Sequence, residues 1–567
     1  MPNEIYHRSN WGESKAEDFG DVYYDHAATN KLYNHSDYYE NSDGTDATLK
    51  DLNNKASIVL TPTAYSDGSL NTVIPPYQVL PTELVTNGDF SNGTTNWTPN
   101  TNATLSIDNG RLKVAISGGS GYPSQNITTV VGKKYKITAD AFIGTATKVS
   151  LYSAAFGFND LTADGSYNLT FTATSTSTQI RLYVYGDGTY GFWDNVSIKE
   201  VQEADFDFSR GSSATRVNEQ GLVENSQGDD FPRIDYTDGT GSLLLEPQRT
   251  NSLPYSEDFT QWTVQSGTTI TSNTTETLSP SGQYNASKIV SNGSVGFYKQ
   301  LSVTGVVSRS IYLKSVTGTV NVKLKDPALT VTTKTLSVTE NWQRFELVES
   351  NGHASQSGLW IDDIPSSGIY AWAAQLESGN YTTSYIPTSG STVTRSADVA
   401  NNSGNADLFN DSEGVLYAEI AALADDQTYR EIAISDGTSN NRIEIRYTNT
   451  SNTLQSVIRS GGTVVMLEST SSYNITNFNK IAVSYKANEF KMYVNSTEVA
   501  VDTSGNAPTG LKELAFDDGN GANDFYGDVK CVAVFKEALS NDLLERLTGE
   551  GYESFRLLAE ANNYTII

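Results

Sequence analysis

The feature that most constrains this chain is a two-residue alternation of apolar and polar side chains, which recurs in short segments. Clear cases are residues 134–139 and 179–185, and Gly-Gly or Asp-Gly turn signals lie between such segments. This period buries one face of a β-strand. At 567 residues, the chain is too long for one hydrophobic core. The sequence therefore predicts an all-β, multidomain protein of tandem antiparallel β-sandwiches.

Charge and composition exclude several classes of partner. The formal net charge is −28, which disfavours nucleic acid and anionic membrane surfaces because both attract basic patches. No stretch reaches the roughly 18 apolar residues of a membrane span, and the N-terminus lacks the pattern of a secretory signal. We expect no nucleic-acid binding, no membrane insertion and no secretory signal. The single cysteine, Cys531, lies in an apolar run, where we expect it to be buried.

The segment 83–201 resembles the jelly-roll carbohydrate-binding modules that are attached to many glycan hydrolases. The resemblance rests on residues 83–90, Trp97, the turn at 109–112 and the terminal segment 192–198. It implies a β-sandwich of roughly 120 residues that binds sugars.

The segment 202–252 has a different character and resembles a connector of predicted phage tail and virion surface proteins. The resemblance rests on residues 205–218, 232–236 and 242–251. In those proteins, a segment like residues 60–76 often closely precedes the connector, so we interpret the first sandwich as an inserted module. Residues 1–82 show no sustained period, and we expect them to form an irregular arm that docks on the virion.

The remainder of the chain predicts two further sandwiches. Residues 253–400 echo the first module, because Asp258-Phe259 followed by Trp262-Thr263 repeats the order of Asp89-Phe90 followed by Trp97-Thr98, which indicates a second jelly roll. Residues 401–567 resemble laminin-G or concanavalin A-like lectin sandwiches, on the segments 414–420, 479–485, 491–495 and 525–529. A C-terminal helix is expected after Ser540 as N-cap, with a stop at Gly549.

Sugar binding needs flat aromatic faces and planar polar groups. Alternation places Arg181, Tyr183 and Tyr185 on one face of a strand, opposite Leu182 and Val184. The candidate carbohydrate-binding residues are Tyr122, Tyr152, Arg181, Tyr183, Tyr185 and Trp193. The alternative is that Tyr183 and Tyr185 pack inward or against a neighbouring subunit.

The other tryptophans of the modules are expected in the core. This prediction covers Trp97 and Trp262 near the start of each jelly roll, and Trp360 and Trp372 in apolar strands of the second.

One acidic loop could supply oxygen ligands to calcium, which takes 6–8 of them. The candidate ligands are Asp517, Asp518, Asn520, Asn523 and Asp524. A plain turn is an equally natural interpretation of this Asp/Gly/Asn-rich loop.

No string of residues points to catalysis. The paired carboxylates of glycan hydrolases, a Gly-x-Ser-x-Gly string before a helix and a phosphate-binding loop are all missing from the sequence. We therefore predict a non-enzymatic protein of the phage virion surface, in a tail or head fibre, that binds host surface polysaccharide for attachment. Its partners are expected to be other virion proteins and further copies of itself, by analogy a trimer. Two alternatives stay open: a purely structural virion component, and a polysaccharide depolymerase.

Overall fold

The computed structural model describes residues 52–561, apart from residues 53–54, 63–64, 67, 227, 293–294, 327–332 and 354–356, together with residue 564. The described residues are almost entirely β-structure in antiparallel sheets, which confirms the predicted fold class. Two compact units divide the chain: residues 75–204 form one, and residues 1–74 with 205–567 form the other. Most of the expected arm, residues 1–51, lies outside the described residues. No helix among the described residues has the length and apolarity to cross a membrane.

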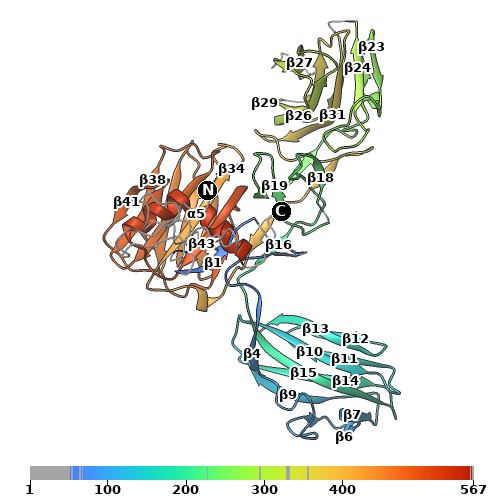
Figure 1. Ribbon diagram of the computed structural model, residues 1–567, viewed down its shortest axis with the longest axis vertical. Coiled ribbons are helices and arrows are strands. Elements are labelled where there is room, and N and C mark those ends of the chain that lie inside the picture. The colour runs from blue at the N-terminus through green and yellow to red at the C-terminus, as the bar shows by residue number, and fades with distance from the viewer. Residues whose placement is uncertain are drawn as a thin grey trace, which may run out of the picture. The chain divides into compact units, whose positions relative to one another are not determined.

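Residues 75–204 form the first jelly roll, a sandwich of two six-stranded sheets (Figure 1). One sheet has the order β13-β10-β15-β7-β6 with β4 paired to β15, and the other has the order β12-β11-β14-β9-β5 with β8 paired to β14. The strands are β4 (Gln78–Glu83), β5 (Thr98–Pro99), β6 (Ala103–Asp108), β7 (Arg111–Ile116), β8 (Ser120–Gly121), β9 (Pro123–Thr128), β10 (Lys134–Phe142), β11 (Lys148–Ser153), β12 (Gly157–Leu161), β13 (Gly165–Thr172), β14 (Ser177–Tyr185) and β15 (Tyr190–Gln202). Inward-facing residues of both sheets make one core.

The second jelly roll repeats this topology strand for strand. Its sheets have the orders β29-β26-β31-β24-β23 and β28-β27-β30-β25-β22. The strands are β22 (Thr263–Val264), β23 (Thr268–Thr271), β24 (Ser287–Ser291), β25 (Phe297–Leu301), β26 (Gly305–Ser315), β27 (Val320–Lys325), β28 (Thr333–Val338), β29 (Gln343–His353), β30 (Ser357–Asp362) and β31 (Ile369–Ser378). Each strand from β22 to β31 therefore has a counterpart in the first module, in chain order, with β4 and β8 as the strands left over.

The predicted tryptophan anchors hold the start of each module. Trp97 and Trp262 are buried, and each packs on a neighbouring phenylalanine. The indole N–H donates to a backbone carbonyl 3.0 Å away in Trp97 and 2.9 Å away in Trp262. Both core predictions are confirmed, as are those for Trp372 and Cys531.

The C-terminal sandwich packs an eight-stranded sheet against a five-stranded one. The larger has the order β19-β20-β43-β34-β39-β40-β41, with β1 also on β43, and the smaller has the order β38-β37-β36-β35-β42. Their strands are β1 (Ala56–Leu60), β19 (Arg233–Asp235), β20 (Ser242–Leu245), β34 (Glu413–Ala422), β35 (Arg430–Ser435), β36 (Arg442–Tyr447), β37 (Leu454–Ser460), β38 (Thr463–Thr470), β39 (Asn479–Lys486), β40 (Glu489–Val494), β41 (Thr497–Asp502), β42 (Glu513–Ala515) and β43 (Gly527–Phe535).

The expectation of an irregular arm over residues 1–82 is wrong for its last third. Strand β1 pairs with the second half of β43, and β2 (Tyr65–Ser66) and β3 (Ser69–Leu70) join β16 (Phe206–Ser209) and β33 (Val399–Asn401) in a four-stranded sheet. Strand β4 belongs to the first jelly roll. Apart from the local pairing of β2 with β3, these pairings join segments more than a hundred residues apart, so no local period predicts them.

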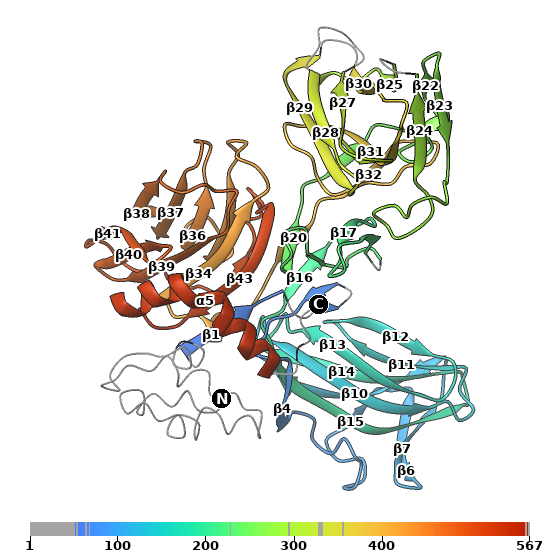
Figure 2. The ribbon, with the colours of Figure 1, turned by 45° about the horizontal axis from the view of Figure 1, so that its top comes forward.

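The predicted C-terminal helix exists but continues past its expected stop. Helix α5 (Asn541–Ala561) begins after Ser540, whose Oγ accepts a hydrogen bond from the backbone N–H of Leu543. Figure 2 shows α5 beside β34, β39 and β43 of the larger sheet. Gly549 does not end it. At Gly551 a Cβ atom would lie 2.2 Å from the hydroxyl oxygen of Tyr417, so the glycine permits close contact between helix and sheet.

The connector folds into short strands that meet both sandwiches of its unit. These are β16 to β20 together with β21 (Arg249–Asn251), where β17 is Thr215–Val217 and β18 is Val223–Asn225. Strand β20 pairs with the first half of β43, and β21 pairs with β32 (Val393–Arg395). The connector is thus an integral part of the sheets.

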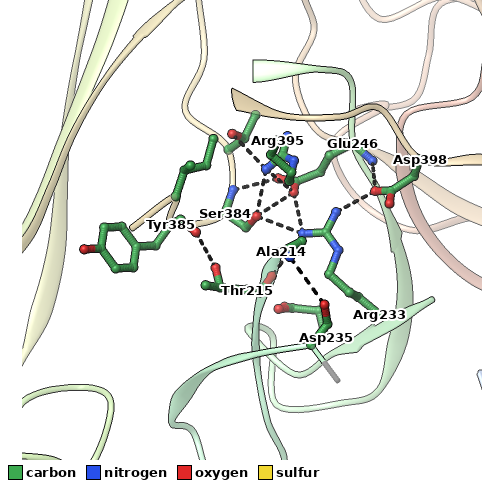
Figure 3. A network of polar contacts seen from close by, with 12 residues as sticks. Ala214, Thr215, Arg233, Asp235, Glu246, Ser384, Tyr385, Arg395 and Asp398 are labelled. Carbon is green, nitrogen blue, oxygen red and sulfur yellow. Dashed lines mark hydrogen bonds and ion pairs between the residues drawn. The ribbon is translucent and has the colours of Figure 1, made fainter. Parts of the chain in front are cut away.

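A buried charged network lies where the connector meets the strands around Arg395 (Figure 3). Arg233 Nη1 lies 2.7 Å from Glu246 Oε2, and Arg233 Nη2 lies 2.5 Å from Asp398 Oδ2. Arg395 shares Glu246 at 2.7 Å, and Arg210 shares Asp398 at 3.0 Å. Burial alone would raise the pKa of Glu246, but Arg395 and Arg233 outweigh it and lower that pKa to about 2.

Candidate functional site

The predicted aromatic residues of the first jelly roll lie on the outward face of the sheet that contains β14. Along β14, burial alternates strictly: Ile180, Leu182 and Val184 are in the core, and Arg181 and Tyr183 face outward. Strand pairing aligns neighbours on this face, because Tyr152 on β11 lies opposite Arg181, and Phe158 on β12 lies opposite Tyr152. We call Tyr122, Tyr152, Phe158, Arg181, Tyr183 and Tyr185 the aromatic face.

The rings of the aromatic face touch one another. The ring of Tyr183 is central: its centroid lies 4.4 Å from that of Tyr122, 5.2 Å from Phe158 and 5.7 Å from Tyr185. The Arg181 guanidinium lies 4.9 Å from the ring centroid of Tyr122. The rings and the cation therefore form one continuous surface.

A second cation flanks this surface. Lys148 Nζ lies 4.4 Å from the ring centroid of Tyr185 and 2.6 Å from Asp160 Oδ2. The hydrogen bond to Asp160 raises the pKa of Lys148, and burial raises the pKa of Tyr185. At neutral pH, the Tyr185 phenol is thus neutral beside the charged amino group of Lys148.

A polar hollow of about 670 Å³ lies toward the other end of the same sheet. The hollow lies on the same outward side of the sheet as the aromatic face. Gln179 and Arg181 both point to that side of β14, and they lie opposite Asn126 and Ser124, which line the hollow. The Nε atom of Arg181 donates to Gln179 Oε1 at 2.7 Å, which links the two regions. The lining residues are Glu83, Leu84, Thr86, Asn96, Thr98, Ser124, Gln125, Asn126, Ile127, Thr128 and Gln179.

The structure brings together five of the six predicted residues and separates one. Trp193 is wholly buried on β15 of the opposite sheet, stacked on Tyr167 at 5.5 Å, so its inclusion was wrong. Its strand has aromatic residues on both sides, with Trp193 facing inward and Tyr190 and Phe192 facing outward, so aromatic character alone could not place it. Phe158 was missed; it is 56% exposed. Its place opposite Tyr152 depends on a hairpin register that the sequence did not reveal. Inward packing of Tyr183 and Tyr185 is also excluded.

The core prediction for Trp360 is wrong. It alternates with buried Leu359 and Ile361 along β30 and faces outward, partly exposed. The apolar residues around it belong to the core side of the strand.

The predicted calcium ligands do not fit a calcium ion. Asp518 Oδ2 lies 3.0 Å from Arg442 Nη1, and its Oδ1 accepts backbone N–H groups of Asn520 and Ala522. Asp517 accepts from the Gly519 N–H, Asp524 accepts from the Tyr526 hydroxyl, and the amide of Asn523 donates to Glu431. Within the described parts of the chain, no three or more His, Cys, Asp or Glu side chains are grouped to hold a metal. These side chains close a turn over the five-stranded sheet instead.

That turn covers a buried acid pair that the sequence did not reveal. Glu431 on β35 and Glu444 on β36 face the same side of the sheet and are at most 1% exposed. Arg446 Nη1 lies 3.4 Å from Glu431, and Arg442 Nε lies 2.5 Å from Glu444. Burial and the neighbouring Glu431 raise the pKa of Glu444 well above its ordinary value. The pair is enclosed and compensated by arginines, so it is not exposed to a substrate in this conformation.

The aromatic face and the polar hollow together suit a ligand with both apolar and hydroxylated surfaces. Aromatic rings pack against the C–H faces of pyranose rings, and Asn, Gln and Thr side chains exchange hydrogen bonds with hydroxyl groups. Fold and site thus define a multidomain β-sandwich protein of jelly-roll and lectin-like modules.

Comparison with known proteins agrees with this class. Residues 420–543 match the family model described as the concanavalin A-like lectin/glucanases superfamily, Laminin_G_3, which confirms the lectin-like prediction for that segment. No curated protein sequence matches the chain.

Solved structures resemble parts of the fold at low identity. The CBM40 of Ruminococcus gnavus IT-sialidase, bound to alpha2,3 sialyllactose, is 16% identical, covering 26% of this chain and 94% of that one, with a TM-score of 0.23. The N-terminal CBM22 tandem domain of Paenibacillus barcinonensis Xyn10C is 11% identical, covering 53% of this chain and 99% of that one, with a TM-score of 0.20. Likeness of this size concerns the fold alone.

Proposed function

We propose that this chain is a non-enzymatic glycan-binding protein and that the aromatic face with the adjoining polar hollow is its binding surface. The observation that carries the proposal is the continuous cluster of four tyrosines, Phe158 and Arg181 on the outward side of a sheet whose other end is a polar hollow. Aromatic rings beside polar groups in a concave region are typical of saccharide sites.

The setting we propose is the surface of a phage virion, in a tail or head fibre, where the protein attaches the particle to host surface polysaccharide. The support is the resemblance of residues 205–251 to connectors of phage surface proteins. The partners would be other virion proteins and two further copies of the chain, because several weak sugar contacts acting together bind strongly. Sedimentation of the purified protein at three times the chain mass is expected, and a monomer would contradict this part.

The test of glycan binding compares three purified full-length proteins on host cells and on their extracted polysaccharide. Wild type should bind both, and the double variant Tyr183→Ala/Tyr185→Ala should lose at least about ten-fold in affinity, since ring contacts contribute about 1 kcal/mol each. The control is Tyr190→Ala. Tyr190 lies on the outward side of the opposite sheet, where Lys113 Nζ is 4.1 Å from its ring, much as Lys148 lies over Tyr185.

The outcomes separate the proposed surface from its rivals. Loss in the double variant with normal binding by the control supports the aromatic face. Equal binding by all three proteins places the site elsewhere, and loss only in the Tyr190 variant moves it to the opposite sheet. No binding by wild type favours a purely structural virion component.

A depolymerase is the second candidate, and the buried Glu431–Glu444 pair is the observation that favours it. Reducing ends released from the polysaccharide are measured in the same samples. We expect none, because the pair is enclosed. Release that Glu444→Gln abolishes would overturn the non-enzymatic proposal.

A further inference from the structure

The second jelly roll presents a row of side chains that corresponds position by position to a row in the first module that crosses the aromatic face. In the first module, strand pairing aligns Thr98, Ser124, Arg181, Tyr152 and Phe158 across the outward side of the sheet. In the second module, the same pairings align Thr263, Tyr298, Trp360, Lys325 and Thr333. The two rows run over corresponding strands, because the two sheets have the same strand order.

The second row has its own aromatic platform. Tyr298 and Trp360 are partly exposed, and their ring centroids lie 5.5 Å apart. Lys325 Nζ lies 4.8 Å from the ring centroid of Trp360. On the inward side, Phe297, Leu324 and Ile361 are fully buried, so the core does not use the platform.

Two polar atoms beneath the platform are buried. The indole nitrogen of Trp360 and the Oδ1 atom of Asp362 have no hydrogen-bond partner among the described residues. Asp362 shares the outward side with Trp360, since it lies two residues further along β30 and opposite Lys323. Both atoms are out of reach of a ligand in this structure, so the polar groups that sugar hydroxyls would meet beside the two rings are the partly exposed side chains of Lys323 and Asp363.

The charges at the platform indicate which kind of sugar fits. Lys325 forms an ion pair with Asp362, and Lys323 Nζ lies 2.6 Å from Asp363 Oδ2. Each lysine is thereby matched by a carboxylate, so no uncompensated cation remains among these side chains to favour an acidic sugar. The first module differs, because the Arg181 guanidinium donates to the neutral side chains of Gln179 and Tyr183.

We infer that the Tyr298–Trp360 platform is a second carbohydrate-binding site, which takes neutral pyranose units of a polysaccharide. This second site extends glycan binding to the second jelly roll. It binds its sugar independently of the aromatic face of the first jelly roll. Two sites with different side chains on one chain raise avidity for glycans that contain both kinds of unit.

The test uses four full-length proteins on one printed array of neutral and acidic bacterial polysaccharides. They are the wild type, Tyr183→Ala/Tyr185→Ala, the same double variant with Trp360→Ala, and the double variant with Trp342→Ala. Trp342 is a matched control, because it is a partly exposed tryptophan of the same module whose indole N–H donates to the Leu278 carbonyl at 2.7 Å. Thermal melts confirm that all four proteins are folded.

The double variant should keep binding to neutral glycans. Adding Trp360→Ala should lower that binding about ten-fold or more, which corresponds to about 1.4 kcal/mol, and adding Trp342→Ala should leave it unchanged. Tyr298→Ala in the double variant provides a second readout if Trp360→Ala unfolds the module.

Each other outcome counts against the inference. If the double variant binds nothing while wild type binds, the proposed function stands and the second site does not. Residual binding that Trp360→Ala leaves intact, or that is confined to acidic glycans, also overturns the second site. If wild type binds no glycan on the array, both proposals fail, and the platform is then better explained as a contact for a virion protein.

Discussion

Arg233 is a fully buried arginine whose charge is met by Glu246 and Asp398 rather than by water. Transfer of charges into a protein interior is costly unless they are paired and hydrogen-bonded. The network around Arg233 therefore stabilises the unit only while it is complete. Residues from the connector and from the segment that follows β31 contribute to it, so its loss would affect segments far apart in the sequence.

Replacing Arg233 by Met should lower the free energy of unfolding by about 3–5 kcal/mol, because Glu246 and Asp398 each lose a buried partner. Urea denaturation of the full chain measures it. The control is Arg556→Met on α5, where the partly exposed Arg556 pairs with Glu560 at 3.2 Å. This change should cost less than about 0.5 kcal/mol. Equal effects would contradict a special role for the buried network.

The same network predicts an acid limit to stability. Folding lowers the pKa of Glu246 from 4.5 to about 2. A carboxyl with a lowered pKa stabilises the fold above its ordinary pKa, and this contribution is lost as the pH falls from about 4.5 toward 2. The loss is about 3 kcal/mol, because a ten-fold change in proton affinity corresponds to roughly 1.4 kcal/mol. Glu246→Gln should be less stable at pH 6 and should lack this part of the pH dependence, which urea midpoints measured at a series of pH values would reveal.

At the scale of elements, a strand of the connector joins the last sandwich without any alternation of buried and exposed residues, because all four residues of β20 are buried. Strand β20 pairs with β43 through Leu243–Val529 and Leu244–Asp528. Ser242 Oγ donates to Asp528 Oδ1 at 2.9 Å. Burial, with a smaller contribution from nearby Asp235, raises the pKa of Asp528 to about 7. This joint between two elements therefore contains a carboxyl that is protonated below neutral pH.

Asp528 should contribute a pH dependence of stability that is opposite in sign to that of Glu246, and the variant Asp528→Asn should lack it. A carboxyl whose pKa is raised from 3.8 to about 7 binds its proton more tightly in the folded state, so wild-type stability falls as pH rises from about 4 to 7. At pH 8 the variant should be more stable than wild type by about 3–4 kcal/mol, and at pH 4 the two should be nearly equal. Urea midpoints at both pH values measure this, and parallel pH profiles would contradict it.

At the scale of the whole molecule, the inserted jelly roll has its own core and brings its two ends together. Val79 lies opposite Val201, and Gln78 lies opposite Gln202, so the first and last strands of the unit are neighbours in one sheet. In the other unit, the backbone N–H of Thr72 donates to Asp205 Oδ1 at 2.7 Å, and β3 pairs with β16. The chain segments that flank the inserted jelly roll are thus held together by their own contacts.

We therefore expect residues 75–204 to fold alone, and the chain with this segment excised to fold without it. Circular dichroism melts of the two pieces, added together, should reproduce the transitions of the full chain. If the chain without residues 75–204 aggregates or lacks a cooperative transition, the other unit needs the inserted jelly roll to fold. Excising residues 253–400 instead should fail, because Glu246 would lose Ser384 and Arg395.

The sequence alone determined features that depend on neighbours along the chain. Alternation predicted a strand over residues 179–185 and both of its faces, and the recurrence of Asp-Phe followed by Trp-Thr at Trp97 and Trp262 predicted the repeated module. Side-chain direction in a strand follows from its period of two residues, so such features need no knowledge of the partner strands.

Only the tertiary structure decided which side of a strand faces the core and which strands pair with one another. Trp193 and Trp360 both lie in apolar, aromatic strands, yet one faces the core and the other faces outward, because only the position of the opposite sheet distinguishes the two sides. Likewise, Asp518 became the partner of Arg442 rather than a calcium ligand. The pairing of β1 with β43 and the register that sets Phe158 beside Tyr183 come from contacts between strands, which a local period does not encode.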